Sequence, residues 1–207
     1  MGKNMNNKEW MGEILAQQGY VQSLYKLFDQ DAKTNEDIFY DLCFCICAPQ
    51  TTFKSNLVTN KMLREKNFFF NDIELSELSK IIKKTRFYNI KARRLMDVKT
   101  NFTRILLVVR GEMSDKDKRS WLVDNVSGLG MKAASHFLRN LGARDLAIID
   151  THIIKFMMCD KPTTKRKYLE IEKQFEEIAK KYGVAMGVLD ALIWKYYSNT
   201  DWENFVF

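Results

Sequence analysis

The segment 127–152 holds two residue types with catalytic chemistry, a lysine and an aspartate. Lys132 comes two residues after a turn at 127–130, and Asp150 stands where a further helix should begin. A deprotonated amine is a nucleophile that forms covalent adducts and Schiff bases with carbon, and a carboxylate accepts protons or stabilises developing positive charge. On the residues alone, a solvated lysine at a helix start is the commoner explanation of Lys132, and Asp150 fits an N-cap, a role that is compatible with catalysis.

An attacking lysine has to lose its proton first. The side chain has an ordinary pKa of ~10.4 and is almost fully protonated at neutral pH. Burial and nearby positive charge would have to lower that value for Lys132 to react.

The turn before Lys132 contains Gly128 and Gly130 between two helical patterns. Glycine permits positive φ and lets a ligand approach the backbone closely. The helix that follows begins with unpaired N–H groups, so the turn can hold a DNA phosphate through main-chain contacts. A C-capping glycine in an ordinary helical hairpin explains the same residues. Four basic residues nearby favour the phosphate site; they are Lys118, Arg119, Lys132 and Arg139.

Helical spacing of apolar residues predicts an all-α chain of about ten helices with little sheet. A cap at Thr34, the stop at Pro49, and caps at Ser114 and Asp150 mark several boundaries. The predicted helices cover 10–28, 34–48, 51–64, 75–84, 88–110 with a break near 100–101, 114 to the glycine turn, 150–158, 165–182 and 184–197. The run 68–70 predicts a buried connection.

The composition favours an anionic partner. The 207 residues carry 33 Lys and Arg against 26 Asp and Glu, a net charge of +7, which favours nucleic acid first and an anionic membrane second. With no leader and no run of ~18 apolar residues, we expect an intracellular chain with no membrane partner.

The four cysteines do not form a secreted disulfide framework in a chain of this size. Cys43 and Cys47 share a helical face, whereas Cys45 points elsewhere, which is poor geometry for a metal cluster. Cys159 stands alone. We therefore expect buried thiols, no metal and no cofactor.

Several motifs together carry a specific resemblance. Residues 127–132 (SGLGMK) resemble the hairpin of the helix-hairpin-helix DNA glycosylases, and 147–152 (AIIDTH) resemble their catalytic aspartate segment. Residues 132–140 resemble the archaeal-type 8-oxoguanine DNA glycosylase/lyases more closely. The segments 44–51, 86–92, 165–172 and 189–194 agree, so the resemblance extends over roughly residues 36 to 197.

The resemblance implies a two-lobed, all-α fold with the active site in the cleft between the lobes. One lobe would cover 45–145 and end in the hairpin, and the other would combine 1–44 with 146–207. It implies that Lys132 is a Schiff-base nucleophile assisted by Asp150. The implied reaction excises 8-oxoguanine from duplex DNA and then nicks the strand by β-elimination.

The resemblance also implies a base pocket. Phe87 and Trp194 match positions that sandwich the flipped purine, and stacking on aromatic faces is sequence-tolerant. Asp190 would orient this pocket or serve as a buried hydrogen-bonding group. Phe207 would contribute its C-terminal carboxylate. For Phe87 and Trp194, plain core packing is the alternative.

Other residues would contact DNA. Gln50 would enter the duplex where the base has left, unless it is an ordinary loop residue. Gly128 and Gly130 would bind phosphate, and His152 would contact phosphate or be structural. His136 is interpreted as packing or hairpin support. We expect the chain to be a monomer.

Three alternative functions stay open. The same fold can act on another damaged base, such as an oxidised pyrimidine or alkylated purine. A non-catalytic helix-hairpin-helix module would bind abasic DNA without forming a covalent adduct. A helical protein that binds a small molecule would show little salt-dependent DNA affinity.

Overall fold

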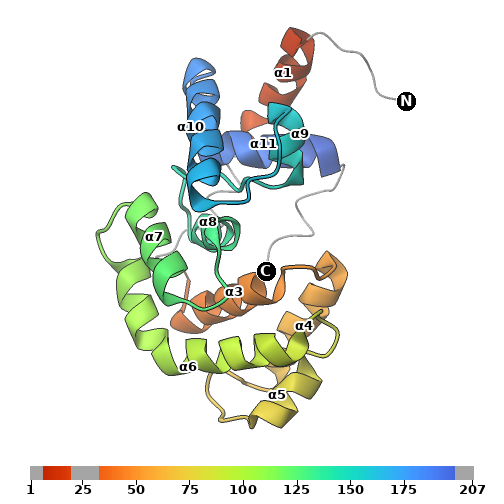
Figure 1. Cartoon of the computed structure of the whole chain (residues 1–207), viewed down its shortest axis with the longest axis vertical. Helices are drawn as coiled ribbons and strands as arrows, with labels where there is room; N and C mark the ends of the chain where they lie inside the picture. Colours follow the sequence, from red (N-terminus) through yellow and green to blue (C-terminus); the bar gives the residue numbers. More distant parts are fainter. Residues whose placement is uncertain (1–6, 20–32, 199–207) are drawn as a thin grey trace. The chain divides into compact units, whose positions relative to one another are not determined.

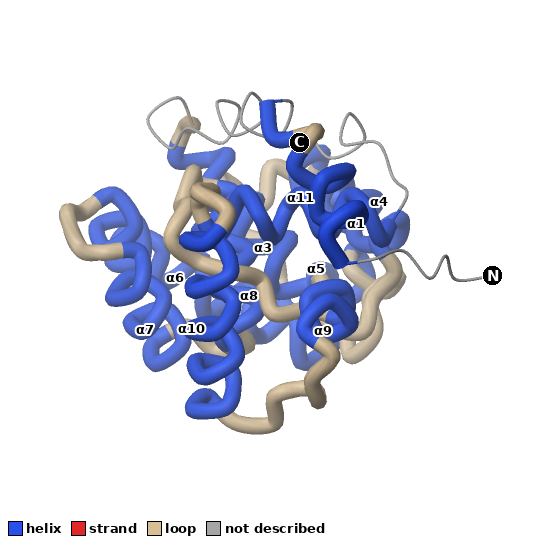
Figure 2. Tube along the Cα trace, turned by 90° about the horizontal axis from the view of Figure 1, so that it is seen from above, coloured by secondary structure: helices blue, strands red, loops and turns tan. Residues whose placement is uncertain are grey.

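A computed structural model describes residues 7–19 and 33–198. Within these residues every element is helix or loop, which confirms the all-α prediction (Figure 2). No described helix is long and apolar enough to cross a membrane. The helices are α1 (Asn7–Leu15), α3 (Asn35–Cys47), α4 (Phe53–Glu65), α5 (Leu75–Ile81), α6 (Tyr88–Arg110), α7 (Asp115–Asn125), α8 (Met131–Asn140), α9 (Thr151–Met157), α10 (Lys165–Lys181) and α11 (Met186–Ser198).

The chain divides into two compact units. One spans Gln30–Leu141 and contains α3 to α8, and the other combines Met1–Asp29 with Gly142–Phe207 and contains α1 and α9 to α11. We call them the hairpin unit and the aspartate unit, after the candidate residues that each carries.

Helix α3 is the central helix of the hairpin unit. Thr34 caps its N-terminus in a reciprocal capping box with Asp37, as the sequence predicted. All residues from Ile38 to Cys47 are buried, nearly all of them apolar, so this helix has to be covered on every side. Helices α4, α6 and α8 pack against it (Figure 1).

Aromatic rings fill the space between α3 and its neighbours. The ring of Phe39 lies 5.5 Å from that of Phe68, 5.2 Å from Phe69 and 5.1 Å from Phe102, measured between centroids. Edge and tilted contacts of this kind suit the ring quadrupoles. Phe70 is 67% exposed, so the prediction that the whole run 68–70 is buried was wrong for its last residue.

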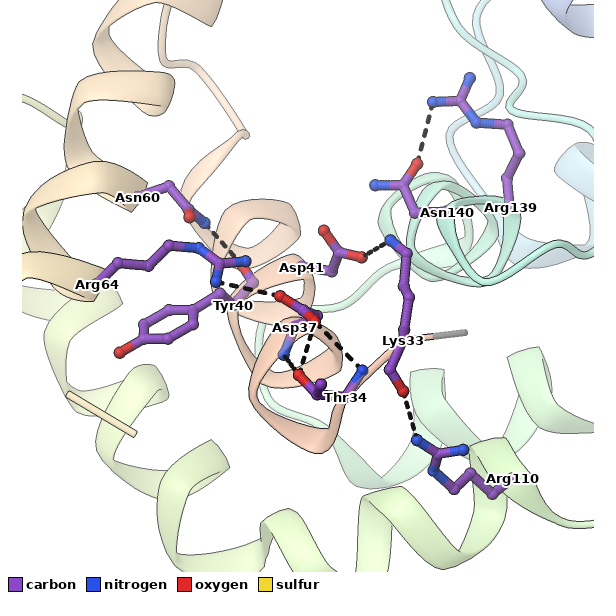
Figure 3. Close-up of polar contacts among 10 residues, drawn as sticks. All are labelled: Lys33, Thr34, Asp37, Tyr40, Asp41, Asn60, Arg64, Arg110, Arg139 and Asn140. Atoms are coloured by element: carbon purple, nitrogen blue, oxygen red, sulfur yellow. Dashed lines mark hydrogen bonds and ion pairs between the residues drawn. The ribbon is translucent and has the colours of Figure 1, made fainter. Parts of the chain in front are cut away.

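Polar contacts tie the start of α3 to α4 and α6 (Figure 3). Lys33 pairs with the buried carboxylate of Asp41, and the Lys33 carbonyl accepts from Arg110 of α6 at 2.8 Å. Arg64 of α4 reaches Asp37 at 3.3 Å. Burial raises the pKa of Asp41 even though Lys33 acts in the opposite direction.

Helix α6 runs unbroken from Tyr88 to Arg110, so the predicted break near 100–101 was wrong. Thr100 and Asn101 donate their side-chain hydrogen bonds to the carbonyls of Met96 and Asp97, one turn back. These bonds stay within the helix, and both residues therefore fit inside it.

The aspartate unit is built around α11. Helices α1, α9 and α10 each pack against it. Helix α10 begins where the sequence predicted, because the Thr164 hydroxyl accepts from the Lys167 N–H at 3.1 Å. The apolar stripe of α10 buries Tyr168, Ile171 and Phe175, and the same helix faces the segment that leads to Asp150.

Candidate active site

The glycine turn joins α7 to α8 in the hairpin unit. Gly128 has a φ of +94°, a conformation that side chains rarely adopt. Gly130 is the N-cap of α8 and provides no side chain to bond the first N–H groups of that helix. The turn therefore offers main-chain donors to an anion.

Lys132 is an exposed residue in the first turn of α8. The positive groups around the hairpin differ from those that the sequence suggested. Lys118 and Arg119 are buried, at 6% and 1% exposure, and Arg119 donates to Ser135 Oγ at 3.0 Å, which links α7 to α8. Both residues are near the turn in the chain, as the sequence indicated, but their side chains are buried and present little charge at the surface.

Arg94 of α6 supplies a charge that sequence reasoning missed. A Cβ atom at Gly128 would lie 2.6 Å from Arg94 Cδ and 3.1 Å from Arg94 Nη1. The arginine side chain thus lies against the hairpin backbone, in space that only glycine leaves open. No sequence pattern links the two positions, because the contact joins helix α6 to a turn far along the chain.

Asp150 is the N-cap of α9 in the aspartate unit. Its Oδ1 atom accepts from the His152 N–H at 2.8 Å and from the Ile153 N–H at 3.1 Å. Among the described residues, none donates to Oδ2. The capping prediction is confirmed, and the geometry leaves one carboxylate oxygen for a reacting group while the other fixes the side chain.

The three residues before Asp150 are held by buried side chains. The N–H of Ala147 donates to Glu172 Oε1 at 3.2 Å, and that of Ile148 donates to Asp190 Oδ2 at 3.1 Å. The Tyr168 hydroxyl accepts from the Ile149 N–H at 3.1 Å and donates to the Ala147 carbonyl at 2.8 Å. The backbone that delivers Asp150 is therefore anchored to α10 and α11.

These bonds give Asp190 a definite place. It is 2% exposed and serves as a buried hydrogen-bonding group, one of the two alternatives that the sequence left open. Glu172 and Tyr168 were not singled out as site residues. They lie within the segment 165–172 that carried the family resemblance, and that motif was the available signal.

Aromatic rings gather beside His152. Its ring stacks on Tyr197 at 6.2 Å with an interplanar angle of 13°, and the Trp194 ring meets it edge-on at 6.4 Å. Lys155 Nζ lies 4.5 Å from the Tyr197 ring centroid. Trp194 is half-buried, so its ring is neither sealed in the core nor fully exposed. Phe207 lies outside the described residues.

Phe87 and Gln50 both lie in the hairpin unit and share an unusual backbone. Phe87 has a φ of +59° and Gln50 a φ of +55°, left-handed values for residues with a side chain. The Phe87 ring is 50% exposed and is covered on one face by the Arg86 guanidinium at 4.9 Å. Plain core packing therefore does not describe Phe87, and an exposed ring is available for stacking.

His136 lies on α8 with its ring edge-on to Phe44 of α3, at 6.2 Å between centroids. Burial, followed by the charges of Arg139 and Lys132, holds the pKa of this imidazole well below its usual 6.5. This contact agrees with the packing role that the sequence suggested.

The cysteines have no visible ligand role. Cys43, Cys45 and Cys47 are buried, and burial raises the pKa of all three, that of Cys47 to about 12. Cys159 is half-buried. No group of three or more His, Cys, Asp or Glu residues suited to a metal ion occurs among the described residues.

The candidate residues separate by unit. Gln50, Phe87, Gly128, Gly130 and Lys132 belong to the hairpin unit. The aspartate unit carries Asp150, His152, Asp190 and Trp194. Each unit thus combines a candidate catalytic group with an aromatic residue suited to stacking.

Comparisons with known proteins point to one family. A family model described as 8-oxoguanine DNA glycosylase matches residues 21–184. The 8-oxoguanine DNA glycosylase/AP lyase of Thermoplasma volcanium is 38% identical over 175 residues, which covers 82% of this chain and 83% of that protein.

Solved structures agree with the sequence comparisons. The crystal structure of the Methanocaldococcus jannaschii 8-oxoguanine DNA glycosylase matches with a TM-score of 0.79 and 29% identity, covering 91% of this chain and 94% of that one. The structure of the Methanocaldococcus jannaschii glycosylase/lyase with a 15mer DNA containing 8-oxoguanine matches with a TM-score of 0.77 and 30% identity, covering 88% and 91%.

Proposed function

The chain belongs to the 8-oxoguanine DNA glycosylase family, and we propose that Lys132 and Asp150 carry out its chemistry. It is a DNA repair enzyme of the helix-hairpin-helix fold, a glycosylase and AP lyase that acts on DNA containing 8-oxoguanine. The enzyme works in association with DNA, and we expect it to do so inside the cell.

The observation that carries the proposal is the position of Lys132. It is an exposed amine in the first helical turn after the glycine hairpin, and the hairpin offers N–H donors to a DNA phosphate. A phosphate bound at the hairpin would bring the adjoining sugar within reach of the Lys132 amine.

The reaction follows from the groups available. The deprotonated Lys132 amine forms a bond to C1′ as the bond from C1′ to the base breaks, and the base leaves with the bonding electron pair. Opening of the sugar ring gives a Schiff base between lysine and C1′. Loss of a C2′ proton then expels the 3′ phosphate and cuts the strand.

Asp150 assists through its Oδ2 atom, as a proton acceptor for the lysine or as a charge partner for the cationic sugar. The capping bonds to Oδ1 support this role because they aim the carboxylate without consuming both oxygens. Phe87 and Trp194 stack on the extruded base, and His152 contacts a phosphate.

Borohydride trapping tests the proposal. Wild type and Lys132→Gln are each incubated with a duplex containing one 8-oxoguanine, in the presence of borohydride. A trapped adduct with wild type and none with Lys132→Gln is expected. Trapping of abasic DNA without trapping of the 8-oxoguanine duplex would preserve the lysine mechanism and reject the lesion. Binding without trapping of either duplex would reject Lys132 as the nucleophile.

A further inference from the structure

A buried lysine on α6 holds the loop that carries Gln50. Lys91 is 2% exposed, and its ammonium donates to the Cys47 carbonyl at 2.7 Å, the Pro49 carbonyl at 2.8 Å and Thr51 Oγ1 at 2.9 Å. A lysine ammonium has three donors, and here each has an acceptor.

Two of the three acceptors belong to the residues on either side of Gln50. The carbonyl of Pro49 immediately precedes it, and the hydroxyl of Thr51 immediately follows it. Gln50 itself is exposed and has a left-handed φ of +55°. An unsupported loop would lose this uncommon backbone readily, since it is less favourable for a residue with a side chain.

Burying the charged side chain of Lys91 costs free energy. Burial lowers the pKa of Lys91, so the surroundings oppose its charge, and a well-packed apolar side chain often stabilises a buried site as well as an ion does. What an apolar residue cannot do is direct two carbonyls and a hydroxyl toward one point. Lys91 thus imposes a shape on the loop.

The same helix contacts the hairpin one turn later. Arg94 lies three residues after Lys91 on α6, and its side chain rests against Gly128. The first turns of α6 therefore touch both the 48–52 loop and the glycine turn, within a single unit.

We propose that Lys91 is a positioning residue that holds the 48–52 loop in the shape required for Gln50 to enter the DNA duplex. Arg94, from the next turn of α6, keeps the phosphate-binding hairpin at a set distance from that loop. This inference rests on the proposed function, because it assigns a role in extruding the damaged base.

The test compares Lys91→Met with Gln50→Ala and with the double variant. Single-turnover excision of 8-oxoguanine should slow about tenfold or more in Lys91→Met, because small displacements of positioning groups have effects of this size. Since Lys91 acts through Gln50, the double variant should be no slower than the slower single variant. Effects that multiply, or a wild-type rate in Lys91→Met, would overturn the proposal.

Lys99→Met is the matched control. Lys99 lies on the same helix and also donates to a loop carbonyl, that of Asn71, but this loop is distant in sequence from Gln50 and the hairpin. The Lys99→Met variant should excise 8-oxoguanine at a rate within about twofold of wild type. Thr51→Val removes only one acceptor of Lys91 and serves if Lys91→Met does not fold; it should slow excision to a smaller extent.

A fluorescence measurement separates this proposal from the proposed function. 2-Aminopurine is placed opposite a tetrahydrofuran abasic analogue, which needs no chemistry at Lys132. Binding of wild type should raise its fluorescence as Gln50 enters the stack, and binding of Gln50→Ala or Lys91→Met should not. A wild-type signal from bound Lys91→Met would reject the role of Lys91, whatever the trapping experiment finds for Lys132.

Discussion

Asp150 performs two tasks with its two carboxylate oxygens. Oδ1 caps α9 by accepting two backbone N–H groups, and we assign the catalytic task to Oδ2. The two tasks respond differently to substitution because asparagine caps a helix about as well as aspartate does but carries no charge.

Asp150→Asn should therefore keep the fold and lose activity. We expect a thermal midpoint near that of wild type and excision slower by about 100-fold or more, the usual range for removing a general base. Asp150→Ala should in addition lose about 1 kcal/mol of stability with the cap. Single-turnover rates and thermal unfolding measure both effects, and full activity in Asp150→Asn would exclude the carboxylate from the reaction.

Gly128 and Gly130 form a matched pair for a second prediction. Gly128→Ala should destabilise the protein by about 1–2 kcal/mol, because alanine is strained at a φ of +94° and its Cβ meets Arg94. Gly130→Ala should change stability less, since no atom lies within 4 Å of its Cβ position and its φ is −88°. Denaturant unfolding measures the unfolding free energy of both variants. Equal losses of stability would mean that the backbone and the Arg94 contact do not require glycine at position 128.

For single residues, the sequence predicted which side chains are candidates for chemistry better than it predicted their burial and contacts. Lys132, Gly128 and Asp150 were recognisable from their spacing and motif. Lys91 was not, because a lysine on a helix usually faces water, and its three acceptors lie 40 or more positions away in the chain. The exposure of Phe87 was equally hidden, since its left-handed backbone depends on how α6 begins.

Among the elements, α8 connects the hairpin to the core. The helix buries Phe137 and Leu138, and His136, one turn after the exposed Lys132, meets Phe44 of α3 edge-on. A histidine whose folded pKa is depressed binds fewer protons when folded than when unfolded. Its contribution to stability is thus present above pH ~6.5 and is lost as the pH falls below that value.

The unfolding free energy of wild type should therefore decrease from pH 6.5 toward pH 5, by at most about 1.4 kcal/mol per pH unit for this one proton. His136→Gln should show a shallower dependence over the same range. Urea unfolding at several pH values measures both slopes. Equal slopes in the two proteins would mean that His136 is not held neutral by the fold.

Element boundaries were predicted well where a capping side chain marked them. Thr34, Ser114, Asp150 and Thr164 each accept a hydrogen bond at the start of a helix. The predicted break in α6 failed for a local reason, because Thr100 and Asn101 bond within the helix. Boundaries without a cap, such as the end of α5, depend on tertiary packing.

For the molecule as a whole, the net charge of +7 predicts salt-dependent DNA affinity. The logarithm of the association constant should fall linearly with the logarithm of salt concentration.

Arg94→Met should reduce the slope by about 1 if Arg94 neutralises a phosphate at the hairpin. Lys180→Met is the control, because Lys180 pairs with Glu176 on α10 at 2.9 Å. Fluorescence anisotropy at several salt concentrations measures the slopes, and an unchanged slope in Arg94→Met would remove it from the interface.

The buried thiols of α3 have a consequence for the conditions in which this enzyme works. Its substrate base arises by oxidation, so the protein is needed when oxidants are abundant. Oxidants attack thiolates and accessible sulfur first. Cys43, Cys45 and Cys47 are enclosed and held in the thiol form, whereas Met158 is 86% exposed at the end of α9. Peroxide should oxidise the exposed thioether of Met158 before it reaches the three buried thiols. These thiols should therefore stay reduced under the oxidising conditions that produce 8-oxoguanine.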